Sequence, residues 1–470
     1  MISFAGIFYF LMITYLKQIN NRLDKAFLQK LLHLALPISL QQMLTASFSL
    51  VDVAMVGQLG TIQLAAVGLV SKSFFVSMHI LSGLASGAGI LAAQYFGKKD
   101  KSQYISVLLI TLTVSLLFTI PLTSLAYFFS EEIMHLLSDN PAIIAEGKIY
   151  IKTSCFFHML TGIVLVYGAM LRSIHHSILP MIAGLIGIIL NTFLNYLLIF
   201  GHFGFSTMGV QGAAIATVLS KCLELGILLL IIHYKKYPLI VNHLYYFKES
   251  FVKKKIKLLL KTSSPIVMSE LSWSMGVFAY YIIYGYIGAN ELAAMSMLEP
   301  LEGIFIQFFV GFGAACTIIL GNQLGAGKPE EAFKTAKMFM LLIPLGGIAA
   351  GIILISCYPL AVLFFDNIST EALALSRQII LLLGGMMCLK LFNMTTMFGI
   401  LRSGGDTKYI FLIDLVSMWG VGVPLAFISA FVMEWPLILV LSMLVAEETV
   451  KMLWSMYRVN SGKWLNNLVS

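Results

Sequence analysis

The chain has 470 residues, of which 59% are hydrophobic and only 11% are charged, with a formal net charge of +8. Soluble domains carry about a quarter charged residues, and so few charges could not cover the surface of a water-soluble fold of this length. The composition therefore excludes a soluble enzyme, a soluble nucleic-acid-binding protein and a secreted disulfide scaffold, and it indicates a chain that lies mostly in lipid. The five cysteines stand singly in apolar stretches, so neither a zinc site nor redox chemistry is indicated.

Twelve apolar runs follow one another along the chain, each long enough to cross a bilayer, which takes about 20 apolar residues. An earlier run, 2–16, is short for a span and has no small-residue cleavage site, so we expect it to lie on the surface or fray and not to act as a signal peptide. The predicted spans are 31–56, 64–92, 104–129, 143–171, 178–201, 208–233, 260–287, 291–320, 337–365, 372–401, 408–433 and 435–457. Continuous apolar runs with short loops are typical of helices and not of barrel strands, so the sequence predicts an all-α integral membrane protein.

The basic residues predict the orientation of these spans. Most of the 30 Lys and Arg residues lie in the loops after even-numbered spans and in the two tails, whereas the opposite loops hold acids such as Glu131, Asp139 and Glu434. Because loops rich in Lys and Arg stay on the cytoplasmic side, both termini are expected in the cytoplasm. An even number of spans agrees with this, and the positive net charge is explained by topology and not by a nucleic-acid partner.

The second half of the chain repeats the pattern of the first half at a nearly constant offset. Pro37 is followed by Gly57, Gly60 and Leu64-Ala65-Ala66, and the same spacing recurs at Pro265, Gly285, Gly288 and Leu292-Ala293-Ala294. The offset covers six spans, so the two halves have the same orientation in the membrane, and such pairs of bundles are typical of alternating-access transporters. The sequence predicts two pseudo-symmetric six-helix bundles, with the following division: tail 1–30, bundle 31–233, cytoplasmic linker 234–259, bundle 260–457 and tail 458–470.

Several motifs resemble those of one family. They include Val51-Asp52, Gln94-Tyr-Phe-Gly97, Leu194-Asn195-Tyr-Leu-Leu-Ile-Phe-Gly201, Gly209 to Thr217, Glu270-Leu-Ser-Trp273, Gly321-Asn-Gln-Leu-Gly325 and Ile400 to Thr407. In their order and in the repeat they resemble the multidrug and toxic compound extrusion (MATE) transporters of the MOP flippase superfamily. The resemblance implies a monomeric proton- or sodium-coupled antiporter in the bacterial inner membrane that expels small organic, often cationic amphipathic, compounds. It implies no cofactor, and 321–328 lacks the spacing of a phosphate-binding loop, so ATP is not expected to drive transport.

In the first bundle the candidate coupling residue is Asp52. It lies five residues, or about 7–8 Å, before Gly57 at the outer end of its span, and a charged group at membrane depth usually marks a transport pathway. The resemblance implies that Asp52 couples cation entry to export. Asn195 stands where some members have an aspartate, so it can at most hydrogen-bond Asp52, and Lys72 is a candidate ion-pair partner. A satisfied carboxylate near the interface is the alternative interpretation.

In the second bundle the candidate coupling residue is Glu270, near the middle of the seventh span and opposite Gln42 in the repeat. Lys390 lies deep in the tenth span, and a buried lysine needs a carboxylate or loses its proton. We expect Lys390 to pair with Glu270 in one state, so that a proton or substrate breaks the pair. Pairing with Asp414 is the alternative.

Further polar and aromatic residues in the spans are candidates for the substrate cleft. Trp273, one turn after Glu270, is the aromatic residue we expect to stack on a cation, whereas Glu447, Glu448 and Lys451 are expected to pair within the last span. The candidates are Gln42, Asn191, Trp273, Tyr280, Glu299, Glu302 and Asn393. A lipid-linked saccharide flippase of the same superfamily and an integral-membrane transferase remain as alternative functions.

Overall fold

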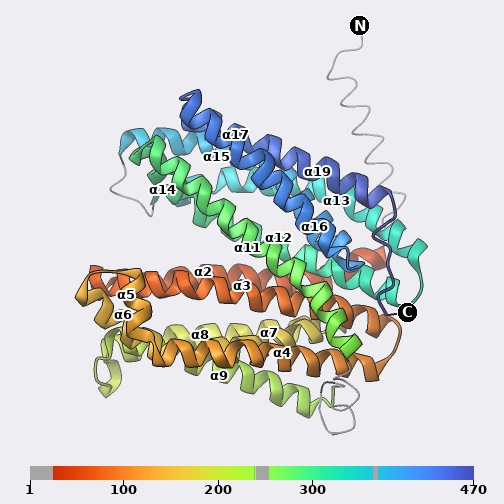
Figure 1. Cartoon of the computed structure of the whole chain (residues 1–470), viewed down its shortest axis with the longest axis horizontal. Helices are drawn as coiled ribbons and strands as arrows, with labels where there is room; N and C mark the ends of the chain where they lie inside the picture. Colours follow the sequence, from red (N-terminus) through yellow and green to blue (C-terminus); the bar gives the residue numbers. More distant parts are fainter. Residues whose placement is uncertain (1–24, 238, 240–252, 364–368, 470) are drawn as a thin grey trace. The chain divides into compact units, whose positions relative to one another are not determined.

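The computed structural model describes residues 25–237, 239, 253–363 and 369–469 (Figure 1). The first half contains α2 (Lys25–Gly57), α3 (Thr61–Gly97), α4 (Lys101–Phe128), α5 (Ser130–Leu137), α6 (Pro141–Ser154), α7 (Phe157–Ser173), α8 (Ile178–Phe200), the 3₁₀ turn η1 (His202–Gly204) and α9 (Gly209–Tyr234). The predicted 2–16 segment lies outside the described residues, as does most of the predicted linker, and the helix after it already begins at Lys253.

The second half contains long helices of similar length, and its later helices are interrupted by π-helical turns. Its elements are α11 (Lys253–Ile287), α12 (Ala289–Gly325), α13 (Pro329–Ser356), α14 (Tyr358–Leu363), α15 (Thr370–Thr395), η2 (Thr396–Leu401), α16 (Thr407–Leu415), η3 (Val416–Gly422), α17 (Val423–Phe427), η4 (Ile428–Val432), α18 (Leu437–Ser442) and α19 (Leu444–Asn460). Every predicted span coincides with one helix or with a consecutive pair or run of these elements, so the predicted all-α membrane fold is confirmed.

Within the described residues, ten helical runs are long and apolar enough to cross a membrane. An eleventh span is formed by α6 and α7, which meet at a 43° bend. The twelfth predicted span corresponds to α18 and α19, which follow one another through Met443. The structure also adds α5, which the sequence analysis did not expect. This helix lies outside the spans, where a 2.5 Å contact from Lys148 Nζ holds the pKa of the Glu131 carboxyl below its ordinary value, through a hydrogen bond and through charge.

The described chain packs into two compact units. Unit 1 comprises 25–39 and 272–468, and unit 2 comprises 40–271. The boundaries therefore fall inside α2 and α11, so that each of these two helices contributes residues to both units. The bundle limits 31–233 and 260–457 remain a prediction about the two membrane-spanning halves.

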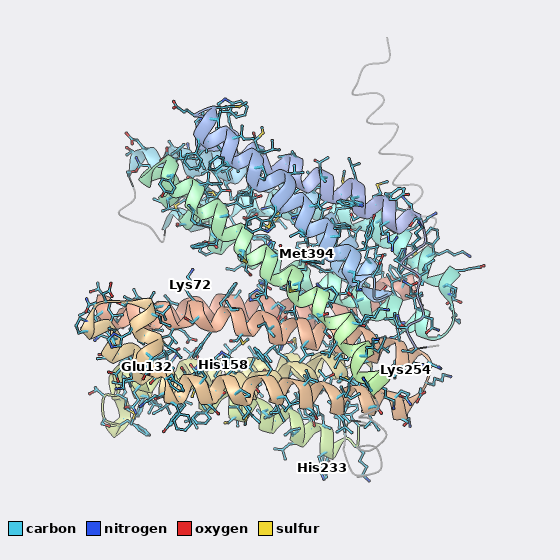
Figure 2. The ribbon with its side chains drawn as sticks, viewed as in Figure 1. Lys72, Glu132, His158, His233, Lys254 and Met394 are labelled. Carbon is cyan, nitrogen blue, oxygen red and sulfur yellow. The ribbon has the colours of Figure 1, made fainter. Side chains whose placement is uncertain are left out.

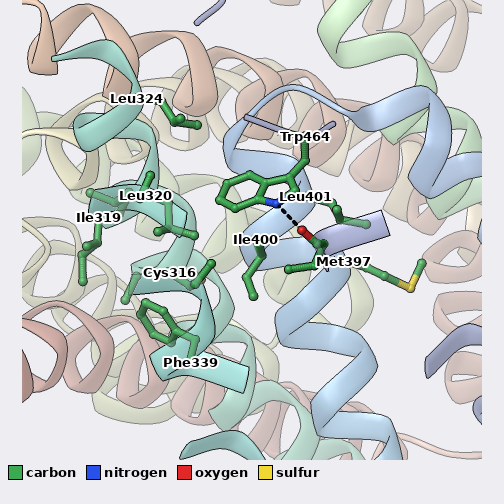
Figure 3. Packing of buried hydrophobic residues seen from close by; sticks show 14 of the residues in the cluster. Cys316, Ile319, Leu320, Leu324, Phe339, Met397, Ile400, Leu401 and Trp464 are labelled. Carbon is green, nitrogen blue, oxygen red and sulfur yellow. Dashed lines mark hydrogen bonds between the residues drawn. The ribbon is translucent and has the colours of Figure 1, made fainter. Parts of the chain in front are cut away.

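Unit 1 has a large apolar core in which α12, α13 and η2 meet (Figure 3). Leu320, Phe339 and Ile400 are almost completely buried there. Trp464, from the segment after α19, fills the same core and donates its indole N–H to the carbonyl of Val459 at 3.0 Å. Because lipid tails are as apolar as these side chains, this core stabilises the fold through close van der Waals packing.

In unit 2 the helices approach closely at glycine, as the pair α8 and α9 shows. A Cβ on Gly212 would lie only 2.6 Å from the carbonyl oxygen of Leu198, so only glycine permits this packing distance. Helices α3 and α7 pack together as well, and α4 contacts both of them. The α8–α9 contact positions Asn191, Asn195 and Thr217, the residues that lie next to Asp52 of α2.

Two pairs of turns repeat in backbone conformation between the halves. Lys99 and Gly327 occupy equivalent positions of the repeat and have φ of 62° and 74°, and the equivalent pair His175 and Gly405 have φ of 67° and 68°. In all four turns the amide of the next residue bonds to a carbonyl five residues earlier, at N···O distances of 2.9 to 3.2 Å. Left-handed residues of this kind end helices. The repeat found in the sequence is therefore also present in the hydrogen-bond pattern.

Candidate functional site

Asp52 projects from α2 into a group of polar side chains on α8. Asn195 donates its Nδ2 hydrogen to Asp52 Oδ1 at 2.8 Å. The side-chain amide of Asn191 is oriented with its nitrogen toward Asp52, because only then do both its nitrogen and its oxygen form hydrogen bonds. The nitrogen donates to the two carboxylate oxygens of Asp52 at 3.1 and 2.8 Å, and the oxygen accepts from the backbone amide of Thr217 on α9 at 3.3 Å. Asn191 and Asn195 are four residues apart and so share one face of α8. The structure thus brings three of the predicted residues together.

The surroundings of Asp52 are polar on one side and apolar on the other. Val56 and Ile199 are buried in the adjacent apolar cluster, and Tyr150 on α6 lies close enough to interact with the Asp52 charge. Asn195 is 2% exposed, and its Oδ1 has no hydrogen-bond donor among the described residues. An oxygen atom of this kind, next to a carboxylate, is the sort of ligand that a hard cation takes.

Lys72 was the predicted ion-pair partner of Asp52. It projects from α3 and is exposed (Figure 2), and the hydrogen bonds that Asp52 accepts come from amide groups. Asp52 therefore carries its charge without an ion-pair partner in the described part of the chain.

Unit 1 contains a second group of polar residues, which is centred on α19. Glu447 is 3% exposed and accepts a hydrogen bond from Lys451 Nζ at 2.6 Å and another from the phenol of Tyr280 on α11. Glu448 accepts from Asn393 Nδ2 on α15 at 2.7 Å and lies 3.8 Å from Lys451. The predicted pairing within the last span is present, but it is part of a network that includes two other helices.

Lys390 joins this network from the other end. Its ammonium forms an ion pair with Glu302 on α12, and both side chains are largely buried. It is also within electrostatic range of Glu447 and Glu448, and Asp414 on α16 stands in the same relation to Lys451. The partner of Lys390 in this structure is therefore Glu302, which was predicted only as a cleft residue, and not Glu270, whose pairing with Lys390 remains a prediction for another state.

The remaining candidates lie apart from these two groups. Glu270 and Gln42 are half-buried residues of unit 2. In unit 1, Trp273 is 46% exposed, and Glu299 is exposed and hydrogen-bonds Tyr281. Sequence reasoning missed Glu447, Glu448 and Lys451 as members of an interhelical network, although three charges in one apolar run were a usable signal.

Nothing in the described part of the chain resembles a metal centre, since no group of three or more His, Cys, Asp or Glu side chains is placed to hold an ion. A shallow surface depression of about 300 Å³ in unit 2 is lined by apolar and mostly exposed side chains, from Ile186, Ile189, Leu190, Phe193 and Leu223. It contains none of the candidate residues, so the chemistry of the site lies with Asp52 and with the α19 network.

Repeated sets of membrane-spanning helices, with charged side chains at membrane depth, are typical of helical membrane transporters. The family model MatE matches residues 37–197 and 265–428, two segments that begin at the repeated prolines Pro37 and Pro265. The chain belongs to the MatE family. The repeat is thus found by the family model as well, and the family that the sequence resembles is confirmed.

Similar proteins cover nearly the whole chain. One is "Uncharacterized transporter YisQ" from Bacillus subtilis, 23% identical, with 94% of this chain and 96% of that protein aligned. Another is "Probable multidrug resistance protein NorM" from Thermotoga maritima, 26% identical, with 93% of both chains aligned. A solved structure described as the outward-facing conformation of a multidrug resistance MATE family transporter superposes with a TM-score of 0.84 at 20% identity, over 92% of this chain and 96% of that one.

These likenesses establish the fold and the general class. The predicted arrangement of twelve transmembrane helices is the fold of the solved MATE transporters. The chain is a multi-pass membrane transporter and not an enzyme, so the transferase alternative is wrong. The flippase alternative is not favoured by any of these similarities.

Proposed function

We propose that this chain is a cation-coupled antiporter that exports organic, cationic amphipathic compounds by alternating access, and that the coupling ion, a proton or sodium, binds at Asp52. It works as a monomer in the bacterial inner membrane, with both termini in the cytoplasm. Relatives named as probable multidrug resistance proteins support the substrate class. The observation that carries the proposal is the carboxylate of Asp52, which is held by amides and has no described ion-pair partner.

The physical reason is the cost of a charge at this depth. Asp52 lies five residues before the end of α2, which is about 7–8 Å at 1.5 Å per residue. Placing a carboxylate inside the membrane costs about 2.5–3.5 kcal/mol or more, so a cation that neutralises it is stabilised there. The amide hydrogens of Asn191 and Asn195 hold the carboxylate in place, and Asn195 Oδ1 offers a further oxygen ligand.

Coupling then follows from competition for one charge. An ion that enters from outside neutralises Asp52 and removes the electrostatic attraction for an organic cation, which is released. When the ion leaves on the cytoplasmic side, the negative charge returns and the next cation binds. A ligand shifts a two-state transporter only through its different affinity for the two states, and here that difference comes from the charge on Asp52.

The test is ethidium efflux from proteoliposomes under an imposed proton gradient and, separately, an imposed sodium gradient. Asp52→Asn keeps the shape of the side chain but removes the charge, so we expect gradient-driven efflux to fall to the level of empty liposomes. The matched control is Asp139→Asn, the same chemical change at an exposed residue outside the spans, which should behave as the wild type. Gradient-driven efflux by Asp52→Asn at the wild-type rate would show that Asp52 is not the coupling site.

A further inference from the structure

Two members of the charged network of unit 1 are replaced by different residue types at the matching positions of unit 2. In the alignment of the repeat that pairs Pro37 with Pro265, Phe74 corresponds to Glu302, and Tyr280, a member of the network, corresponds to Asp52. Each half of the repeat therefore has its own polar group, and at the position that the two groups share, unit 1 has Tyr280 where unit 2 has Asp52. The α19 network needs an explanation that does not depend on Asp52.

The network has more acids than bases. Glu302, Glu447 and Glu448 are held by the two ammonium groups of Lys390 and Lys451. Lys390 binds Glu302 directly, and Lys451 binds Glu447 at 2.6 Å but reaches Glu448 only at 3.8 Å. Glu448 thus has the weakest compensation by a cation. A buried acid without full compensation attracts positive charge.

An oxygen atom beside Glu448 also lacks a donor. Asn393 is 4% exposed and donates its Nδ2 hydrogens to Glu448, whereas Oδ1 of the same amide has no hydrogen-bond partner among the described residues. Buried polar atoms are nearly always satisfied, so an orphaned acceptor of this kind needs a water molecule or an ion. Hard monovalent and divalent cations take carboxylate and amide oxygens as ligands.

A glycine and two π-helical turns lie next to the network. A Cβ on Gly422 would collide with both Glu447 Oε2 and the Tyr280 hydroxyl, so a larger residue there would displace the ends of these two side chains. Gly422 ends the π-helical turn η3, and a second π-helical turn, η2, follows Asn393 by three residues. Such turns occur frequently at functional sites. The local backbone therefore accommodates the network, which is more than a contact between flexible side chains.

We propose that this network is a monovalent cation site and that the ammonium of Lys390 occupies the place of a free cation. Lys390 thereby excludes sodium from unit 1. The carboxylates of Glu302 and Glu448 and the amide oxygen of Asn393 are oxygen ligands suited to a free cation. Lys390 supplies one positive charge to the same group of acids, and a sodium ion bound there would be repelled by the ammonium. If the lysine charge is removed, we expect the acids to bind one free cation in its place.

The proposal predicts a gain of sodium binding when the lysine charge is removed. We would measure thermal unfolding of the full chain in nanodiscs, in NaCl and in N-methylglucamine chloride at equal ionic strength. All variants carry Asp52→Asn, which removes the coupling site proposed above from the measurement. Lys390→Met in this background should show a sodium-specific rise of about 2 °C in Tm, as expected for a ligand at several times its Kd. Asp52→Asn alone should show none.

Two matched variants assign the site. Lys390→Arg keeps the positive charge and should show no sodium-specific rise, and adding Glu448→Gln to the Lys390→Met protein should abolish the rise. If Lys390→Met is not recovered as folded protein, Lys390→Gln makes the same charge change with a polar end. The absence of a sodium-specific rise in the lysine-free variants overturns the proposal, and so does a rise of the same size in the Asp52→Asn protein. Neither result bears on coupling at Asp52, because that charge is absent throughout.

Discussion

At the scale of single residues, Gly422 on η3 leaves room for the hydrogen bond between Tyr280 of α11 and Glu447 of α19. We expect Gly422→Ala to lower the free energy of unfolding by about 1–3 kcal/mol, because the new methyl group displaces the buried Tyr280–Glu447 hydrogen bond. Gly420→Ala is the matched control on the same turn, since its Cβ would meet only a methyl group of Val416 at 3.7 Å. Thermal unfolding in detergent measures both. Equal stability of the two variants would contradict the packing described for Gly422.

The sequence predicted which residues belong to the site, but it did not predict which residues pair with one another. Charge at membrane depth indicated Asp52 and Lys390, and the family motif indicated Asn195, which does contact Asp52. The pairing of Lys390 with Glu302 was not predictable, because rotating either helix about its axis by part of a turn would direct Lys390 toward Glu447 and Glu448, which also lie near it. A helical period alone does not determine which neighbouring helix a polar side chain meets.

At the scale of helices, the two halves of the repeat begin equivalent helices differently. Asp100 caps α4 by accepting a hydrogen bond from the amide of Gln103 at 3.1 Å, whereas Lys328, its repeat equivalent, gives α13 no side-chain cap. We expect Asp100→Ala to cost about 1 kcal/mol in the free energy of unfolding. Lys328→Ala removes only an exposed ion pair with Glu331 and should cost less than about 0.5 kcal/mol. The comparison uses equilibrium unfolding, and an equal cost would exclude the capping role.

Helix positions were predicted well because hydrophobic length and turn residues determine them locally. The predicted seventh span starts at 260, later than α11, because a run of lysines at 253–257 is typical of a cytoplasmic linker. The π-helical turns η2, η3 and η4 were not predictable, since they depend on side chains of other helices packed against them. The division of α2 and α11 between the two units is likewise a result of tertiary packing, which the hydrophobic pattern does not contain.

At the scale of the whole molecule, orientation depends on whether the last segment crosses the membrane. Among the described residues, ten helical runs and the bent α6–α7 pair give eleven spans, and an odd number would place the two termini on opposite sides. Helices α18 and α19 make the twelfth, but each is too short to qualify alone, and α19 carries Glu447, Glu448 and Lys451. These charges are stabilised by one another and by Tyr280 and Asn393, so the segment is tolerated inside the membrane.

Reporter fusions decide the orientation. We expect a fluorescent protein fused after residue 470 to be fluorescent, and one fused to a truncation after His176, behind the basic Arg172 loop, to be fluorescent as well. Alkaline phosphatase fused after Gly204, between α8 and α9, should be active because that loop is predicted to face outward. An active phosphatase at the C-terminus, with the two internal fusions unchanged, would mean that α18 and α19 do not cross. The buried network of unit 1 would then lie at the membrane surface, where its charges require no compensation.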